Sequence, residues 1–169
     1  PRTNYKDYGI RILNVDETGN VQFVVHGYMD RGIHEGHVGA AFYSYSSMQD
    51  TVEENVYVDS NKSADIVSRD IKKLSYVNKS GTCYFMLDGA IYTVDMTTRE
   101  NKKVISGLNE DDIRISDTGE TAAWQETGSH YACRNVTCIN MNDGTMKKIA
   151  ADNGDYIMPL GFMQENLVY

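Results

Sequence analysis

The densest group of side chains that could do chemistry lies in the glycine-rich segment 27–39. His34, Glu35 and His37 are closely spaced there, and zinc or nickel accepts imidazole and carboxylate ligands. The helical His-Glu-x-x-His pattern is missing, however, and the glycines of this segment disfavour a helix. We therefore expect neither a bound metal nor a cofactor. Long glycine-rich loops on rigid sheets often carry function, so we expect ligand contacts here, with a plain solvated loop as the alternative.

Two tyrosines on a following predicted strand extend this candidate surface. Tyr43 and Tyr45 point to one strand face and Ser44 points to the other. Exposed tyrosine rings can stack on a sugar or a peptide, and the alternative is that both rings are half-buried in a sheet. The predicted ligand-binding residues are Tyr28, Arg31, His34, Glu35, His37, Tyr43 and Tyr45.

Patterns that would indicate catalysis are missing or have the wrong geometry. Glu53 and Glu54 are neighbours on a predicted strand and point to opposite faces, so they cannot face one another across a sugar as glycosidase carboxylates do. The sequence has no Gly-x-Ser-x-Gly elbow, no phosphate-binding loop and no dinucleotide fingerprint. We predict a protein that is not an enzyme and has no catalytic residues.

Composition argues against a nucleic-acid partner and against a membrane-spanning segment. The 169 residues carry a formal net charge of −8, and lysines cluster only as isolated pairs. Nucleic-acid binding needs clustered positive charge, so we expect no nucleic-acid partner. No apolar run approaches the roughly 20 residues that cross a bilayer, so this segment is not expected to span a membrane.

The three cysteines are too few for a disulfide framework, and none lies in a Cys-x-x-Cys pair. Cys83 alternates with Phe85 and Leu87 on one predicted strand face, which indicates a small buried residue. Cys133 and Cys138 could pair across a bend or remain free thiols.

A repeated unit organises the chain, and it predicts an all-β protein of antiparallel, four-stranded, blade-like sheets. In each copy a polar turn closed by glycine leads into a short apolar strand, and further strands follow across tight turns. Asp88-Gly89 favours a type I′ hairpin. We interpret residues 1–169 as a single region with blades at 10–58, 71–105 and 113–149 and a half blade at 156–169. Between the first two blades we expect a loop or single helical turn at 63–70 and a strand at 71–77.

These motifs resemble the repeat of TolB-like β-propellers. The residues that carry the resemblance are Ser116-Asp117-Thr118-Gly119 leading to Trp124, Ile91-Tyr92-Thr93-Val94-Asp95, and Cys138-Ile139-Asn140-Met141-Asn142-Asp143-Gly144. The proline that usually precedes the turn Asp is absent, and the copies differ in length. The resemblance implies a partial or open β-propeller of about three and a half blades, and we expect the natural polypeptide to be longer.

The resemblance also implies a non-enzymatic binding, sensory or scaffolding module, extracellular or in a bacterial cell envelope, with a protein, peptide or glycan as ligand. Two alternatives stay open. The region could be the propeller portion of a prolyl-oligopeptidase-like hydrolase whose catalytic domain lies elsewhere. It could also be a structural domain that self-associates edge to edge through unpaired strands.

Overall fold

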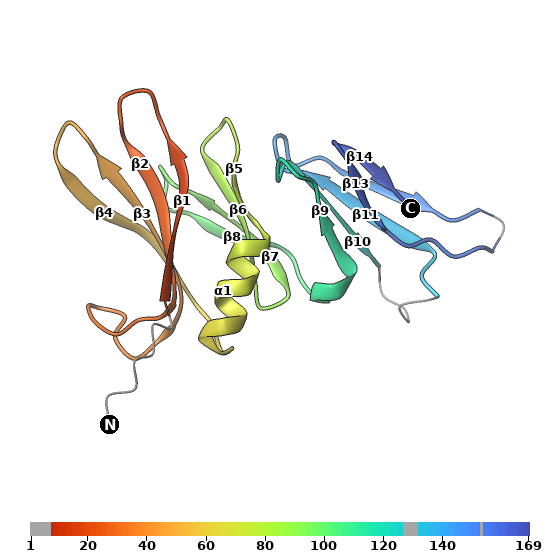
Figure 1. The fold of residues 1–169 in the computed structure, drawn as a ribbon, viewed down its shortest axis with the longest axis horizontal. Coiled ribbons are helices and arrows are strands. Elements are labelled where there is room, and N and C mark those ends of the chain that lie inside the picture. Colours follow the sequence, from red (N-terminus) through yellow and green to blue (C-terminus); the bar gives the residue numbers. More distant parts are fainter. Residues whose placement is uncertain (1–7, 127–131, 153) are drawn as a thin grey trace.

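The computed structural model describes residues 8–126, 132–152 and 154–169, and antiparallel sheets follow one another along this chain (Figure 1). The first blade contains β1 (Tyr8–Val15), β2 (Val21–Tyr28), β3 (Val38–Ser46) and β4 (Thr51–Asp59). The second contains β5 (Ser75–Val77), β6 (Thr82–Leu87), β7 (Ala90–Asp95) and β8 (Asn101–Ile105). The third contains β9 (Ile113–Ile115), β10 (Thr121–Gln125), β11 (Asn135–Asn140) and β12 (Met146–Ala150). The C-terminal hairpin pairs β13 (Gly161–Met163) with β14 (Asn166–Val168).

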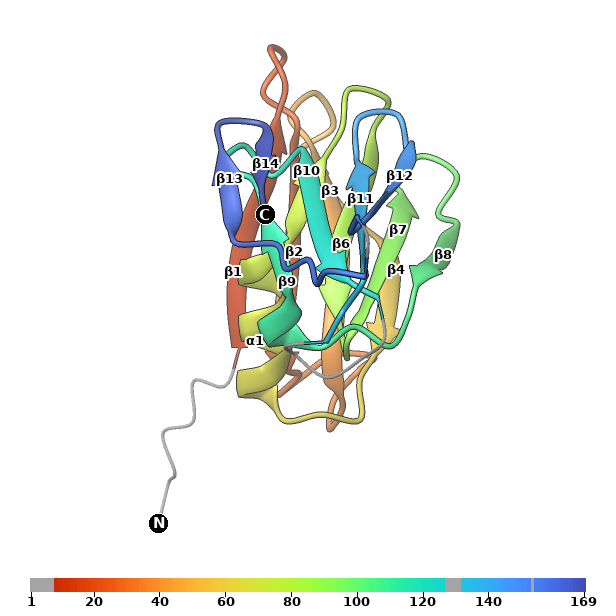
Figure 2. The same ribbon diagram turned by 90° about the vertical axis from the view of Figure 1, so that its right-hand side faces the viewer.

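The predicted fold class is confirmed. In each blade the strands pair in chain order and antiparallel, and no ladder joins one blade to the next among the described residues. The sheets stack face against face, as the two perpendicular views show (Figures 1 and 2). The protein is therefore all-β and built from blade-like sheets in an open array. None of the described helices combines the length and apolarity that crossing a bilayer requires.

The connection between the first two blades differs from the prediction. A helix, α1 (Ala64–Lys73), replaces the expected loop at 63–70 and the start of the expected strand at 71–77, so that β5 begins only at Ser75. Val67 and Ile71 lie on one helical face and are fully buried between the blades. The apolar residues of this segment fit both the helical and the strand periodicity, and the burial of Val67 and Ile71 favours the helix. A 3₁₀ turn (Glu110–Asp112) precedes β9.

The same polar turn joins the first two strands of every blade. Its lead residue is Asp16, Asn78 or Ser116, and the backbone N–H of the glycine three residues later donates to the lead carbonyl at 3.1, 3.0 and 2.9 Å. These glycines have φ values of 83°, 84° and 78°, a left-handed conformation that other residues rarely adopt. The lead side chain also accepts backbone N–H bonds within its turn. The repetition predicted from the sequence is thus present in atomic detail.

The second blade is packed on both faces. On one face Phe85 contacts Phe42 of the first blade, with ring centroids 4.6 Å apart, in a core that includes Cys83 and the buried face of α1. On the other face Met86 belongs to the core that holds Trp124 of the third blade. Burying side chains of this size stabilises the fold by roughly 1.5–3 kcal/mol each. The predicted burial of Cys83 is confirmed, and Trp124 is buried as well.

Two local predictions are also decided. Asp88 and Gly89 have φ values of 53° and 69°, as a type I′ hairpin requires, and they join the paired residues Leu87 and Ala90. Cys133 and Cys138 are free thiols, so the alternative of a disulfide between them is wrong.

Candidate functional site

The predicted ligand loop is an extension of one hairpin of the first blade. Val25 pairs with Ala41 in the first blade as Leu87 pairs with Ala90 in the second. Residues 26–40 take the place of the two-residue turn 88–89, and β2 and β3 are prolonged accordingly. Met29 closes the end of the loop, because its N–H donates to His37 O at 2.8 Å and its carbonyl accepts from Gly36 N at 2.9 Å.

The loop folds back so that His34 lies over β4. Its ring stacks on Tyr57 with centroids 3.7 Å apart, and its Nε2 lies 2.8 Å from Glu54 Oε1. Tyr43 Oη donates to the other oxygen of Glu54 at 2.7 Å. Burial, followed by the bond to Glu54, raises the pKa of Tyr43 to about 12. The structure therefore joins two predicted residues, His34 and Tyr43, through Glu54, which was not among the predicted site residues.

The remaining predicted residues occupy three places. Tyr28 and Arg31, with Tyr43, line an open cleft of about 330 Å³ beside the loop. His37 Nδ1 lies 3.3 Å from Asp59 Oδ1 on the exposed rim, and Glu35 is also exposed. Tyr45 lies apart from this group, and its hydroxyl donates to Asp50 at 3.1 Å. In the described part of the chain no three His, Cys, Asp or Glu side chains converge as metal ligands.

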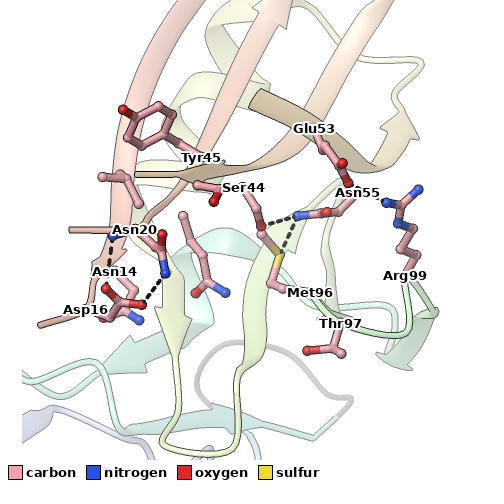
Figure 3. A pocket seen from close by; sticks show the side chains of 13 residues that line it. Asn14, Asp16, Asn20, Ser44, Tyr45, Glu53, Asn55, Met96, Thr97 and Arg99 are labelled. Carbon is pink, nitrogen blue, oxygen red and sulfur yellow. Dashed lines mark hydrogen bonds and ion pairs between the residues drawn. The ribbon is translucent and has the colours of Figure 1, made fainter. Parts of the chain in front are cut away.

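A larger, more polar pocket of about 420 Å³ lies between the first and second blades (Figure 3). Strands β1 to β4 and the β1–β2 turn supply one wall, and the β7–β8 turn supplies the other. Amide and hydroxyl groups dominate the lining, whose residues are Asn14, Asp16, Asn20, Val21, Gln22, Ser44, Tyr45, Ser46, Glu53, Asn55, Met96, Thr97 and Arg99. Only Tyr45 among these was predicted as a site residue. The available signal was Gln22, a polar residue within the otherwise apolar run 21–25.

The charged groups of this interblade pocket are already engaged. Asp16 accepts hydrogen bonds from Thr18 and Asn20, and their side chains lower its pKa to about 2. On the opposite side Arg99 Nη2 donates to Glu53 Oε2 at 2.8 Å. The charges at both ends of the pocket therefore have partners within the protein, and the centre of the lining is neutral.

Gln22 also lines this pocket. Its Oε1 atom is buried and accepts no hydrogen bond from the described residues, although buried polar atoms are ordinarily paired. Nearby, Asn55 Nδ2 is held by Ser44 Oγ at 2.7 Å. A second depression of about 270 Å³, towards β5, shares Asn14 and Gln22 with the pocket. The arrangement offers amide and hydroxyl groups, with the nearby charges already paired, to a polar, uncharged ligand.

The chain matches no family model and no curated protein. It is similar to the solved structure of TolB from Acinetobacter baumannii, with 13% identity, a TM-score of 0.42, and coverage of 87% of this chain and 33% of that one. It is also similar to dipeptidyl peptidase 4 from Porphyromonas gingivalis, with 11% identity, a TM-score of 0.41, and coverage of 88% and 26%. For oligogalacturonate lyase from Vibrio parahaemolyticus the identity is 10%, the TM-score 0.36, and the coverage 83% and 46%. The chain thus spans less than half the length of each of these structures.

Proposed function

We propose that this chain is a non-enzymatic binding module of a bacterial cell-envelope protein, and that a neutral glycan occupies the pocket between the first and second blades. The observation that carries the proposal is the lining of this pocket, in which amides and hydroxyls predominate and the charged groups are paired within the protein. Sugar hydroxyls can both donate to and accept from such amide and hydroxyl groups. The acidic net charge and the TolB-like motifs support the envelope setting.

The state of the carboxylates supports binding without catalysis. A general acid or base works best when its pKa lies near the working pH. Asp16 has a pKa of about 2 and is tied into its turn, while Glu53 is paired with Arg99. Neither group is poised for proton transfer to a bound sugar.

The proposal is tested by NMR titration with glucose, galactose and N-acetylglucosamine as separate probes. We expect at least one sugar to shift the side-chain amide signals of Gln22 and Asn55. Gln22→Leu removes an amide side chain from the lining of the pocket and should weaken that binding by about tenfold or more, equivalent to about 1.4 kcal/mol.

Gln49→Leu is the matched control, because Gln49 lies exposed on the β3–β4 turn outside the pocket. This variant should bind as the parent protein does. Equal affinity in the Gln22→Leu variant, or unshifted amide signals with all three sugars, would rule out the assignment.

A further inference from the structure

A row of polar side chains crosses the first blade on the side that faces the second blade. Successive ladder partners across β1 to β4 in this row are Asn14, Gln22, Ser44 and Glu53. Ladder partners share a sheet face, and with adjacent strands about 4.8 Å apart the row is roughly 14 Å long. All of these side chains are at least partly exposed and line the interblade pocket. The row therefore forms one polar wall across the width of the blade.

The equivalent row between the second and third blades is built differently. With the two hairpins aligned as described above, the second blade has Tyr84 where the first blade has Gln22. The partner of Tyr84 on the preceding strand is Tyr76, whereas the partner of Gln22 is Asn14. Two aromatic rings of the second blade therefore stand where the first blade has two short amides.

These tyrosines occupy the space between the second and third blades. Tyr84 is 7% exposed and belongs to the core that holds Trp124. Tyr76 Oη donates to Asn142 Oδ1 on the β11–β12 turn at 2.6 Å. A Cβ on Gly144 of the same turn would lie only 3.3 Å from Tyr84 Oη. Both rings thus extend to the third blade and fill the space between the sheets.

The shorter side chains of the first blade leave the corresponding space open. Asn14 and Gln22 line the interblade pocket of about 420 Å³. The turn on its opposite wall is β7–β8, which has the same place in its blade as β11–β12 has in the third. The residues of the row therefore account for the opening between the first two blades, rather than the stacking of sheets alone.

The opening continues towards β5. Asn14 and Gln22 also line the second depression of about 270 Å³, which includes Lys79 on the β5–β6 turn. The two depressions therefore adjoin at these amides, and we call them together the transverse site. The ion pair of Arg99 with Glu53 stands at its other end. The transverse site is longer than a single sugar ring, because the polar row alone spans roughly 14 Å.

We propose that the transverse site binds a linear oligosaccharide, which lies across the strands of the first blade with adjoining sugar units in the two depressions. This inference rests on the proposed function, because it extends the same glycan site. Asn14 and Gln22 contact the chain where it passes from one depression to the other, and Lys79 donates to the unit beyond them. Amides and hydroxyls in a row suit the repeated hydroxyls of such a chain.

The test compares single sugars with short chains by NMR titration. Glucose is set against cellotriose, galactose against galactotriose, and N-acetylglucosamine against chitotriose. We expect the trisaccharide of the sugar that binds to do so about tenfold more tightly or better, because its linked units engage both depressions at once. The signals that shift should include the backbone amides of both Lys79 and Arg99.

Two variants and a matched control locate the chain. Gln22→Tyr introduces the side chain that fills the equivalent space of the second blade, and it should weaken binding of monosaccharide and trisaccharide alike by about tenfold or more. Lys79→Ala should reduce the advantage of the trisaccharide over the monosaccharide. Lys62→Ala should keep that advantage, since Lys62 is exposed and lines neither depression.

The possible failures are distinguishable. Equal affinities for a monosaccharide and its trisaccharide would overturn the transverse site and leave the glycan pocket of the proposed function in place. An advantage that Lys79→Ala does not reduce, or tight trisaccharide binding by the Gln22→Tyr variant, would also overturn it, because the chain would then not cross the row. If sugars of neither length bind, the proposed function fails and this inference fails with it.

Discussion

At the scale of single residues, the environment of His26 disfavours the protonated form of its ring. The side chain is 2% exposed, and its Nδ1 lies 3.1 Å from Ser68 Oγ of α1. Gly9 makes room for the ring, because a Cβ at that position would lie 2.5 Å from His26 Cε1. Burial lowers the pKa of His26 below its usual 6.5, and the positive charges of Lys72 and Arg11 lower it further. Charging this ring inside the fold is therefore costly.

This environment predicts that the protein loses stability in mild acid. The unfolded chain takes up a proton on His26 near pH 6.5, whereas the folded protein resists it. The contribution of His26 is thus complete above about pH 6.5 and declines as the pH falls below that value, by up to about 1.4 kcal/mol per pH unit. Thermal or urea unfolding measured across this range should show the decline.

His26→Gln should flatten this part of the pH profile, whatever its effect on stability at neutral pH. His37→Gln should not, because His37 is exposed beside Asp59. Identical slopes in the parent protein and the His26→Gln variant would assign the acid sensitivity to the carboxylates.

At the scale of elements, the lead side chain of the repeated turn makes different hydrogen bonds in different blades. Asp16 is exposed, and among the described residues its carboxylate bonds only within its own turn. Asn78 is 7% exposed, and besides the bonds in its turn its Nδ2 donates to Met141 O of the third blade at 3.0 Å. Tyr76 reaches the same region, where its hydroxyl bonds Asn142 Oδ1 at 2.6 Å. The turn of the second blade is thus also a link between sheets.

Asn78→Ala should therefore cost more stability than Asp16→Ala. The change at Asn78 leaves buried backbone groups unpaired in two blades, and we expect a loss of about 2–3 kcal/mol. The loss at Asp16 should be smaller, because water can replace the exposed carboxylate. Urea unfolding midpoints at constant m-value provide the comparison, and equal losses would mean that the bond to Met141 contributes nothing.

The elements also show what sequence could and could not predict. Strands and glycine turns were predictable because alternation and turn chemistry are local properties. Helix α1 was not predictable, because the local sequence fits both a helix and a strand. Burial of Val67 and Ile71 between two blades favours the helix. The interblade pocket could not be predicted from the sequence either, because strand register and a bulge bring Gln22 and Asn55 together. No short motif encodes that placement.

At the scale of the whole molecule, each sheet relies chiefly on its immediate neighbours. The second blade has a core on both faces, whereas the C-terminal hairpin contributes to a smaller core, whose buried members among the described residues are Ala123, Val136 and Ile157. A stack of this kind opens in parts, and its ends open first. Glu165 provides an additional tie, because its carboxylate accepts hydrogen bonds from Thr118 and Thr121 of the third blade at 2.5 and 3.0 Å.

Amide hydrogen exchange should therefore be slowest in β6 and β7 and fastest in β13 and β14. Glu165→Ala should speed exchange in the hairpin and leave β6 and β7 unchanged, because it removes only the tie to the third blade. Mass spectrometry of peptic fragments can resolve these segments. Uniform protection along the chain would show instead that the stack unfolds as one cooperative unit.

The shared turn also bears on how such a chain can evolve. One backbone geometry is served by an aspartate in the first blade, an asparagine in the second and a serine in the third. An exchange among Asp, Asn and Ser at the lead position is therefore compatible with the turn, provided that the glycine three residues later is retained. The backbone bonds of this turn define the repeat more faithfully than the identity of its amino acids does.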